Sequence, residues 1–169
     1  MNLFFNKRNS ILTLGLFLSM LAFLSACEQQ QYEPNVSASP GGGTVTTYKS
    51  YSLTSATGST VYGRVVFYKY NTSVTLVEMG LYNTTTGTAY SSSIYEGKVA
   101  ESSAKSLKTL DAISGATGSF SSNKYYVINE AGFYDKLSTY NANVKIMLGT
   151  TLVASGNVGG NAIPVAQSE

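Results

Sequence analysis

An alternation of apolar and polar residues with a period of two runs through much of this 169-residue chain and restricts its fold more than any other feature. Because successive side chains of a β-strand point to opposite faces of the sheet, such segments are typical of half-buried strands. In "VYGRVVFYKY" one face carries Val61, Gly63, Val65 and Phe67, and the other carries Tyr62, Arg64, Val66, Tyr68 and Tyr70. In "TLVEMGLY" one face carries Val77, Met79 and Leu81, and the other carries Glu78 and Gly80. Both segments predict strands with one face in a core.

The same reasoning predicts about eight strands in one domain. Turn-forming residues at 71–73 and 83–87 separate the first runs. Further strands are expected at Lys105–Leu110, Ser119–Ile128, Asn143–Leu148 and Thr151–Val158, with one helical turn near Ala131–Leu137. Tyrosine, with 13 residues, and threonine suit a pleated surface, while charged residues make up only 12% of the chain. Strands that recur without long helices between them predict an all-β fold, an antiparallel sandwich or barrel.

The N-terminus has the pattern of an export signal. Lys7 and Arg8 precede an apolar run, Ile11–Leu24, of the length of a secretory h-region. The run ends in "LSAC", which resembles a bacterial lipobox, so residues 1–26 are expected to be a lipoprotein signal peptide and Cys27 its lipidated residue. The alternative is an ordinary cleavage site with a bystander cysteine. Since Cys27 is the only cysteine of the chain, the rest of the protein has no thiol with which to form a disulfide.

A tether and a single domain follow the signal. Residues 27–47 lack apolar periodicity and include a triple glycine, which is typical of a flexible linker. The β-domain is expected at 48–164 and a short C-terminal tail at 165–169. Glu28, rather than aspartate, follows the cysteine, which resembles outer-membrane sorting in bacteria that use that rule. We therefore expect a lipid-anchored protein of the cell envelope, in the outer membrane, on either its periplasmic or its outer face.

The charge balance excludes one class of partner. Without Lys7 and Arg8, which leave with the signal, the chain from Cys27 onward carries nine basic and nine acidic residues. A neutral surface offers no electrostatic footprint for nucleic acid, and no basic cluster adjoins the lipid to reinforce membrane binding. The expected partners are the membrane, through the N-terminal lipid anchor, and an unknown protein or glycan.

Several short segments together resemble the CHRD domain family, including its bacterial lipoprotein versions. The resemblance covers about residues 51–161 and rests on an ordered set of positions: Gly63, Val65 and Phe67; Leu110, Asp111, Gly115 and Gly118; Tyr140, Asn143 and Val144; and the closing "ASGNVG" of 154–159. It implies a Greek-key β-sandwich distantly similar to copper/zinc superoxide dismutase. The family has no well-established general activity, so the resemblance implies a fold more than a reaction.

The chain departs from the family where a metal would bind. CHRD domains commonly carry His-x-His where this chain has Ser93, Ile94 and Tyr95, and often Asn-Val-His where it has Asn143, Val144 and Lys145. The sequence contains no histidine, and hydroxyl and ammonium groups are poor ligands for copper or zinc, so no metal and no cofactor are expected. Ser93, Tyr95 and Lys145 instead form a candidate ligand-binding site for an anion or a sugar. The alternative is that these side chains satisfy one another on a sheet face.

Two further features have alternative interpretations. The row Tyr62, Tyr68 and Tyr70 either stacks on sugar rings or packs across strands, the commoner use of such rows. The acidic residues show no converging pair, and only Glu96, close to Ser93 and Tyr95, lies where a hydrolase could use it. No catalytic residue is therefore assigned, and no enzymatic activity is expected.

Two hypotheses about function remain. The first is a non-catalytic cell-envelope lipoprotein whose CHRD-like sandwich is a structural or interaction module that binds a protein or glycan. The second is a degenerate, superoxide-dismutase-like protein that still binds a metal ion.

Overall fold

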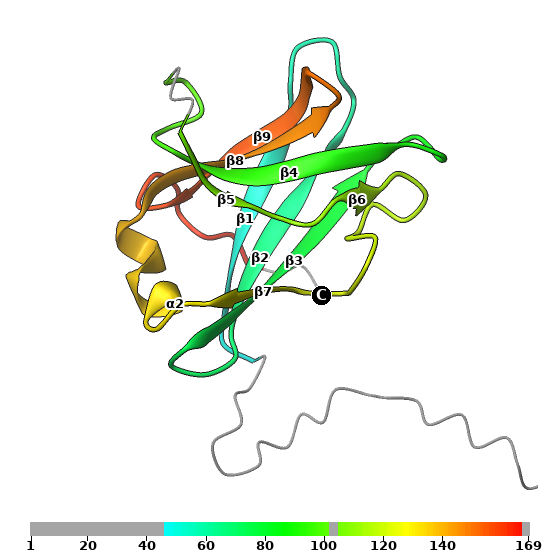
Figure 1. Ribbon diagram of the computed structural model, residues 1–169. Coiled ribbons are helices and arrows are strands. Elements are labelled where there is room, and N and C mark those ends of the chain that lie inside the picture. Colours follow the sequence, from blue (N-terminus) through cyan, green and yellow to red (C-terminus); the bar gives the residue numbers. More distant parts are fainter. Residues whose placement is uncertain (1–45, 102–104, 167–169) are drawn as a thin grey trace, which may run out of the picture. The chain divides into compact units, whose positions relative to one another are not determined.

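The computed structural model describes residues 46–101 and 105–166. The predicted signal peptide, Cys27 and nearly all of the predicted tether lie outside these residues. Figure 1 shows the arrangement of the elements, which are β1 (Tyr48–Ser55), β2 (Tyr62–Lys69), β3 (Val74–Tyr82), β4 (Ala89–Glu96), β5 (Ser106–Thr109), β6 (Ile113–Ser114), β7 (Tyr126–Asn129), α2 (Phe133–Lys136), a 3-10 turn (Leu137–Thr139), β8 (Asn141–Leu148) and β9 (Thr151–Gly159).

The strands form one antiparallel sheet that curls into two layers. Its order is β5-β4-β8-β9-β1-β2-β3-β7, and the short β6 pairs with β4 off this path. β1 joins the layers, since it pairs with β2 from Tyr48 to Leu53 but with β9 only at Thr54 and Ser55. The described ladder ends at β5 and at β7 and does not close into a barrel. These two edges face each other, since Lys108 of β5 forms an ion pair with Glu130, which directly follows β7. The predicted all-β antiparallel fold is confirmed.

Three connections of the described chain cross between the layers. They run from β3 to β4, from β6 to β7 and from β7 to β8, so that β3 lies beside β7 and β4 beside β8. Strands that are consecutive in the chain but are not neighbours in the sheet are typical of Greek-key topology. The helical turn α2 lies on the third crossing, between β7 and β8. It is at the end of the sandwich where β1 begins, because Lys49 of β1 donates a hydrogen bond to Ser138 beside α2.

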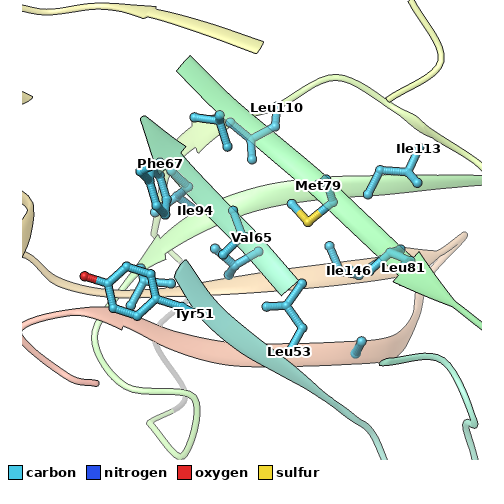
Figure 2. Close-up of a cluster of buried hydrophobic side chains, with 14 of the residues drawn as sticks. Tyr51, Leu53, Val65, Phe67, Met79, Leu81, Ile94, Leu110, Ile113 and Ile146 are labelled. Atoms are coloured by element: carbon cyan, nitrogen blue, oxygen red, sulfur yellow. The ribbon is translucent and has the colours of Figure 1, made fainter. Parts of the chain in front are cut away.

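Apolar side chains from both layers fill the space between them. The alternation predicts the inner face correctly, since Val65, Phe67, Val77 and Met79 are buried. Figure 2 shows Tyr51, Leu53, Val65 and Met79 from one layer meeting Ile94 and Ile146 from the other. Burying such a set supplies most of the favourable free energy of a domain without disulfides.

The outer face of β2 differs from the simple alternation. Val66 and Tyr68, on the face opposite Phe67, are also buried. Tyr125 packs edge-on against the Tyr68 ring, with centroids 5.7 Å apart, and Val165 pairs with Ser50, the register neighbour of Val66. Loop and C-terminal segments therefore cover part of a face that a two-residue period predicts to be exposed.

One predicted strand is wrong for most of its length. The expected strand Ser119–Ile128 reduces to β7, which begins only at Tyr126. Before it, the chain pairs with residues 112–114 through Ser114 and Ser121 rather than extending along β3. The polar run "SSNK" has few apolar groups to bury, and Phe120 alone turns inward against Ile113.

Candidate functional site

The three predicted ligand-binding residues lie together on the outer face of the β4–β8 pair. Ser93 and Lys145 are register partners, and Tyr95 follows two residues later on the same face of β4. All three side chains are half-buried. The Lys145 Nζ lies 5.0 Å from the centroid of the Tyr95 ring, which is cation–π geometry. Lys145 and Tyr95 therefore contact each other, and ligand binding at these three residues stays a prediction.

The neighbouring polar residues fix a turn. Asn143 is fully buried, and its Nδ2 donates a hydrogen bond of 2.9 Å to the carbonyl of Gly97. Asn157 accepts one of 2.7 Å from the backbone N–H of Val99. Glu96, the residue considered for hydrolysis, forms an ion pair with Lys105 at 3.3 Å. These contacts fix residues 97–99, which directly follow β4, and pair Glu96 with a lysine.

A second arrangement, on the other layer, has open space beside it. Tyr62 of β2 and Tyr82 of β3 are register partners whose rings stack with centroids 5.2 Å apart and planes 25° apart. The two residues are 47% and 53% exposed. Cross-strand stacking thus builds an aromatic platform of two stacked rings, about half of which is exposed to water.

Two hollows flank this platform. One has a volume of about 410 Å³ and is lined by Ser52, Thr54, Tyr62, Arg64, Tyr82 and Val165, among others. The second, of about 340 Å³, is lined by Arg64, Val66, Glu78, Gly80, Tyr82 and Ser119, among others. Arg64 and Tyr82 line both hollows. We call the surface formed by Tyr62, Tyr82, Arg64, Ser52, Thr54 and Glu78 the tyrosine groove.

The polar groups of the tyrosine groove are unevenly paired. Glu78 accepts a hydrogen bond of 2.7 Å from the Tyr68 hydroxyl and lies 3.8 Å from Lys124. The neighbouring Tyr125 side chain and then the charge of Glu78 raise the pKa of Lys124. Arg64, by contrast, forms no ion pair with any described residue. A guanidinium with five donors beside an exposed aromatic stack can hydrogen-bond a hydroxyl or carboxylate of a ligand lying on the rings.

The sequence identified only part of this groove. Tyr62 was in the predicted tyrosine row, but Tyr68 of the same row is only 8% exposed and packs against Tyr48 and Tyr125. Tyr82, the actual stacking partner, and Arg64 were missed as site residues. The signal that would have found Tyr82 is the β2–β3 register, which places it opposite Tyr62.

Metal, membrane and family comparisons add no further site. Within 46–101 and 105–166, no three His, Cys, Asp or Glu side chains gather closely enough to hold a metal ion. No helix in this part of the chain has the length and apolar character needed to cross a bilayer. Comparison of the chain with protein-family models, with curated proteins and with solved structures finds no match in any of the three.

Proposed function

We propose that this chain is a non-catalytic lipoprotein of the bacterial cell envelope whose CHRD-like sandwich binds a glycan through the tyrosine groove. The observation that carries the proposal is the exposed Tyr62–Tyr82 stack beside Arg64, which forms no ion pair with an acidic residue in the described part of the chain. The lipobox-like "LSAC" segment supports the location, and the ordered CHRD-like positions support the family.

The groove suits a saccharide because both kinds of contact that a sugar needs occur in one place. The apolar face of a pyranose ring stacks on an aromatic platform, and its hydroxyl groups need donors and acceptors at the edge of that platform. Arg64 supplies donors, Glu78 an acceptor, and Ser52 and Thr54 hydroxyl groups that do both. Since Arg64 pairs with no acidic side chain among residues 46–101 and 105–166, a sugar that carries a carboxylate is favoured over a neutral one.

Titration of the full chain, purified in detergent, with an oligogalacturonate and with its methyl ester tests the proposal. We expect the acid form to bind more tightly than the ester, and Arg64→Gln to remove that preference. Tyr62→Ala and Tyr82→Ala should each weaken binding about five- to tenfold, as expected for the loss of one stacking ring.

Tyr70→Ala is the matched control, because Tyr70 is also an exposed tyrosine at the end of β2 but lies outside the groove residues. Loss of binding in Tyr70→Ala equal to that in the groove variants would contradict the proposed site. So would an unchanged affinity in Tyr62→Ala and Tyr82→Ala.

The second hypothesis, a degenerate superoxide-dismutase-like metal protein, makes a separate prediction. A stoichiometric copper or zinc ion bound only by the native state would raise the melting temperature, and a chelator would lower it. Elemental analysis of the same detergent-purified protein after incubation with both metals distinguishes the hypotheses, because the glycan proposal needs no ion.

A further inference from the structure

A separate cavity opens where the two edges of the sheet face each other. It has a volume of about 190 Å³ and is lined mainly by apolar side chains, among them Phe67 of β2, Phe133 of α2 and Tyr140. The Phe133 ring lies 6.3 Å from Phe67 and 5.1 Å from Tyr140, centroid to centroid. We call this cavity, with Lys108 and Glu130 at its lining, the edge pocket. It lies away from the tyrosine groove, with which it shares no lining residue.

The acidic residue of the edge pocket, Glu130, already binds the ammonium group of Lys108. Lys108 of β5 places its Nζ 3.1 Å from Glu130 Oε2 and 5.7 Å from the centroid of the Phe133 ring. Tyr140 donates a hydrogen bond of 3.2 Å to the other carboxylate oxygen of Glu130. The Lys108 hydrogen bond is the main cause of a lowered Glu130 pKa, so this carboxylate is ionised at neutral pH. A carboxylate next to aromatic faces is the usual environment for binding an organic cation.

The Lys108 ammonium is a replaceable occupant. It is carried by a flexible four-carbon side chain on a four-residue edge strand, and that side chain is 29% exposed. Burial raises the pKa of Tyr140, which keeps its hydroxyl protonated as the second donor to Glu130. Exposed ion pairs contribute little to stability, so exchanging one ammonium for another costs little.

The apolar cavity behind Glu130 matches one small ring in size. A dry protein cavity of about 150 Å³ lined by apolar side chains takes up benzene, and the edge pocket is somewhat larger, at about 190 Å³. We propose that the edge pocket binds small aromatic amines, with the ring in the cavity and the ammonium replacing that of Lys108 at Glu130.

The test is a protein-observed NMR titration of the full chain in detergent with 2-phenylethylammonium, followed at the amides of Phe133 and Tyr140. We expect a dissociation constant on the order of 1 mM, as for other ligands of this size. Lys108→Met removes the competing ammonium while keeping much of the side chain, and should tighten binding up to about fivefold. Glu130→Gln should weaken it at least tenfold.

Lys105→Met is the matched control, because Lys105 is an exposed lysine near β5 that pairs with Glu96 and does not line the pocket. It should leave the affinity unchanged. A gain of affinity in Lys108→Met cannot come from misfolding, so that variant tests the proposal even if Glu130→Gln is unstable.

Phenylacetate, an aromatic ligand with a negative charge, is titrated in parallel to test whether the edge pocket prefers an anion to a cation. If phenylacetate binds more tightly than the amine and Lys108→Met abolishes its binding, the pocket is an anion site and the proposal is overturned. Weaker amine binding by Lys108→Met, or no shift at Phe133 and Tyr140 at any soluble amine concentration, overturns it as well.

Discussion

Two glycines in the β2–β3 ladder have opposite surroundings. Gly63 pairs with Leu81, and a Cβ at this position would overlap the carbonyl oxygen of Gly80. Gly80 pairs with Arg64, and a Cβ there would meet no atom within 4 Å. Close approach of the backbones therefore requires glycine at position 63, whereas position 80 only adds open space beside Arg64.

We expect Gly63→Ala to lower the free energy of unfolding by about 2–3 kcal/mol, since the added methyl group pushes the two strands apart. Gly80→Ala should leave it unchanged or raise it by up to about 1 kcal/mol, because alanine loses less backbone entropy than glycine on folding. Urea denaturation of both variants measures the difference. Equal stability of the two would contradict the steric explanation.

From the sequence alone, only the resemblance to CHRD domains marks the glycines at which a side chain would clash. A Cβ would overlap neighbouring backbone at each of the five glycines in the CHRD-like positions, which are Gly63, Gly115, Gly118, Gly156 and Gly159. The conflicting atoms belong to distant segments, such as Ser52 for Gly156. No local pattern marks such a position, because the constraint exists only once the strands have paired.

At the scale of elements, strand existence was predictable and strand pairing was not. The strand at Thr151–Val158 and the helical turn near Ala131–Leu137 were predicted within a few residues, because alternation and its interruption are local signals. The expected strand Ser119–Ile128 was wrong over most of its length, since the chain there pairs with residues 112–114, which include the short β6, rather than extending along β3. The edge pocket had no signal at all, because the facing of β5 and β7 depends on strand order.

An ion pair between Lys108 of β5 and Glu130, which follows β7, connects the two open edges of the sheet. A hydrogen bond from Lys108 is the main cause of the lowered pKa of Glu130, whose ordinary value is 4.5. A carboxylate with a lowered folded-state pKa stabilises the native state above its unfolded value, and this contribution is lost as pH falls through the folded value.

We therefore expect the wild-type protein to be more stable than Glu130→Gln at pH 7, by less than about 1 kcal/mol for so exposed a pair. The difference should shrink as pH falls below 4.5 and vanish below the folded pKa of Glu130. Thermal unfolding of both proteins from pH 7 to pH 3 measures it. A difference that stays constant over this range would show that the ion pair does not contribute.

At the scale of the whole molecule, the proposed function depends on strand register and on the proposed lipid anchor. Tyr62 and Tyr82 lie 20 positions apart, and only the β2–β3 register stacks them next to Arg64. The sequence therefore predicted a row of tyrosines on a sheet face that includes Tyr62. It predicted neither the stacking partner, Tyr82, nor the two hollows beside the stack. The membrane face on which the proposed glycan would be bound depends in turn on the proposed anchor at Cys27.

The last prediction concerns the proposed anchor at Cys27. The chain from this residue onward carries equal numbers of basic and acidic residues, so it has no net electrostatic attraction to anionic headgroups. Acyl chains attached to the cysteine would then supply the membrane affinity, and two or more of them suffice for stable anchoring. Cys27→Ala, expressed in a bacterium with lipoprotein-processing enzymes, should move from the membrane fraction to the soluble fraction, and mass spectrometry should find the diacylglycerol thioether only on the wild-type chain. A Cys27→Ala variant that stays attached to the membrane would show that the lipid is not the anchor. It would leave the tyrosine groove intact, because the residues that line its two hollows lie between positions 52 and 165, far along the chain from Cys27.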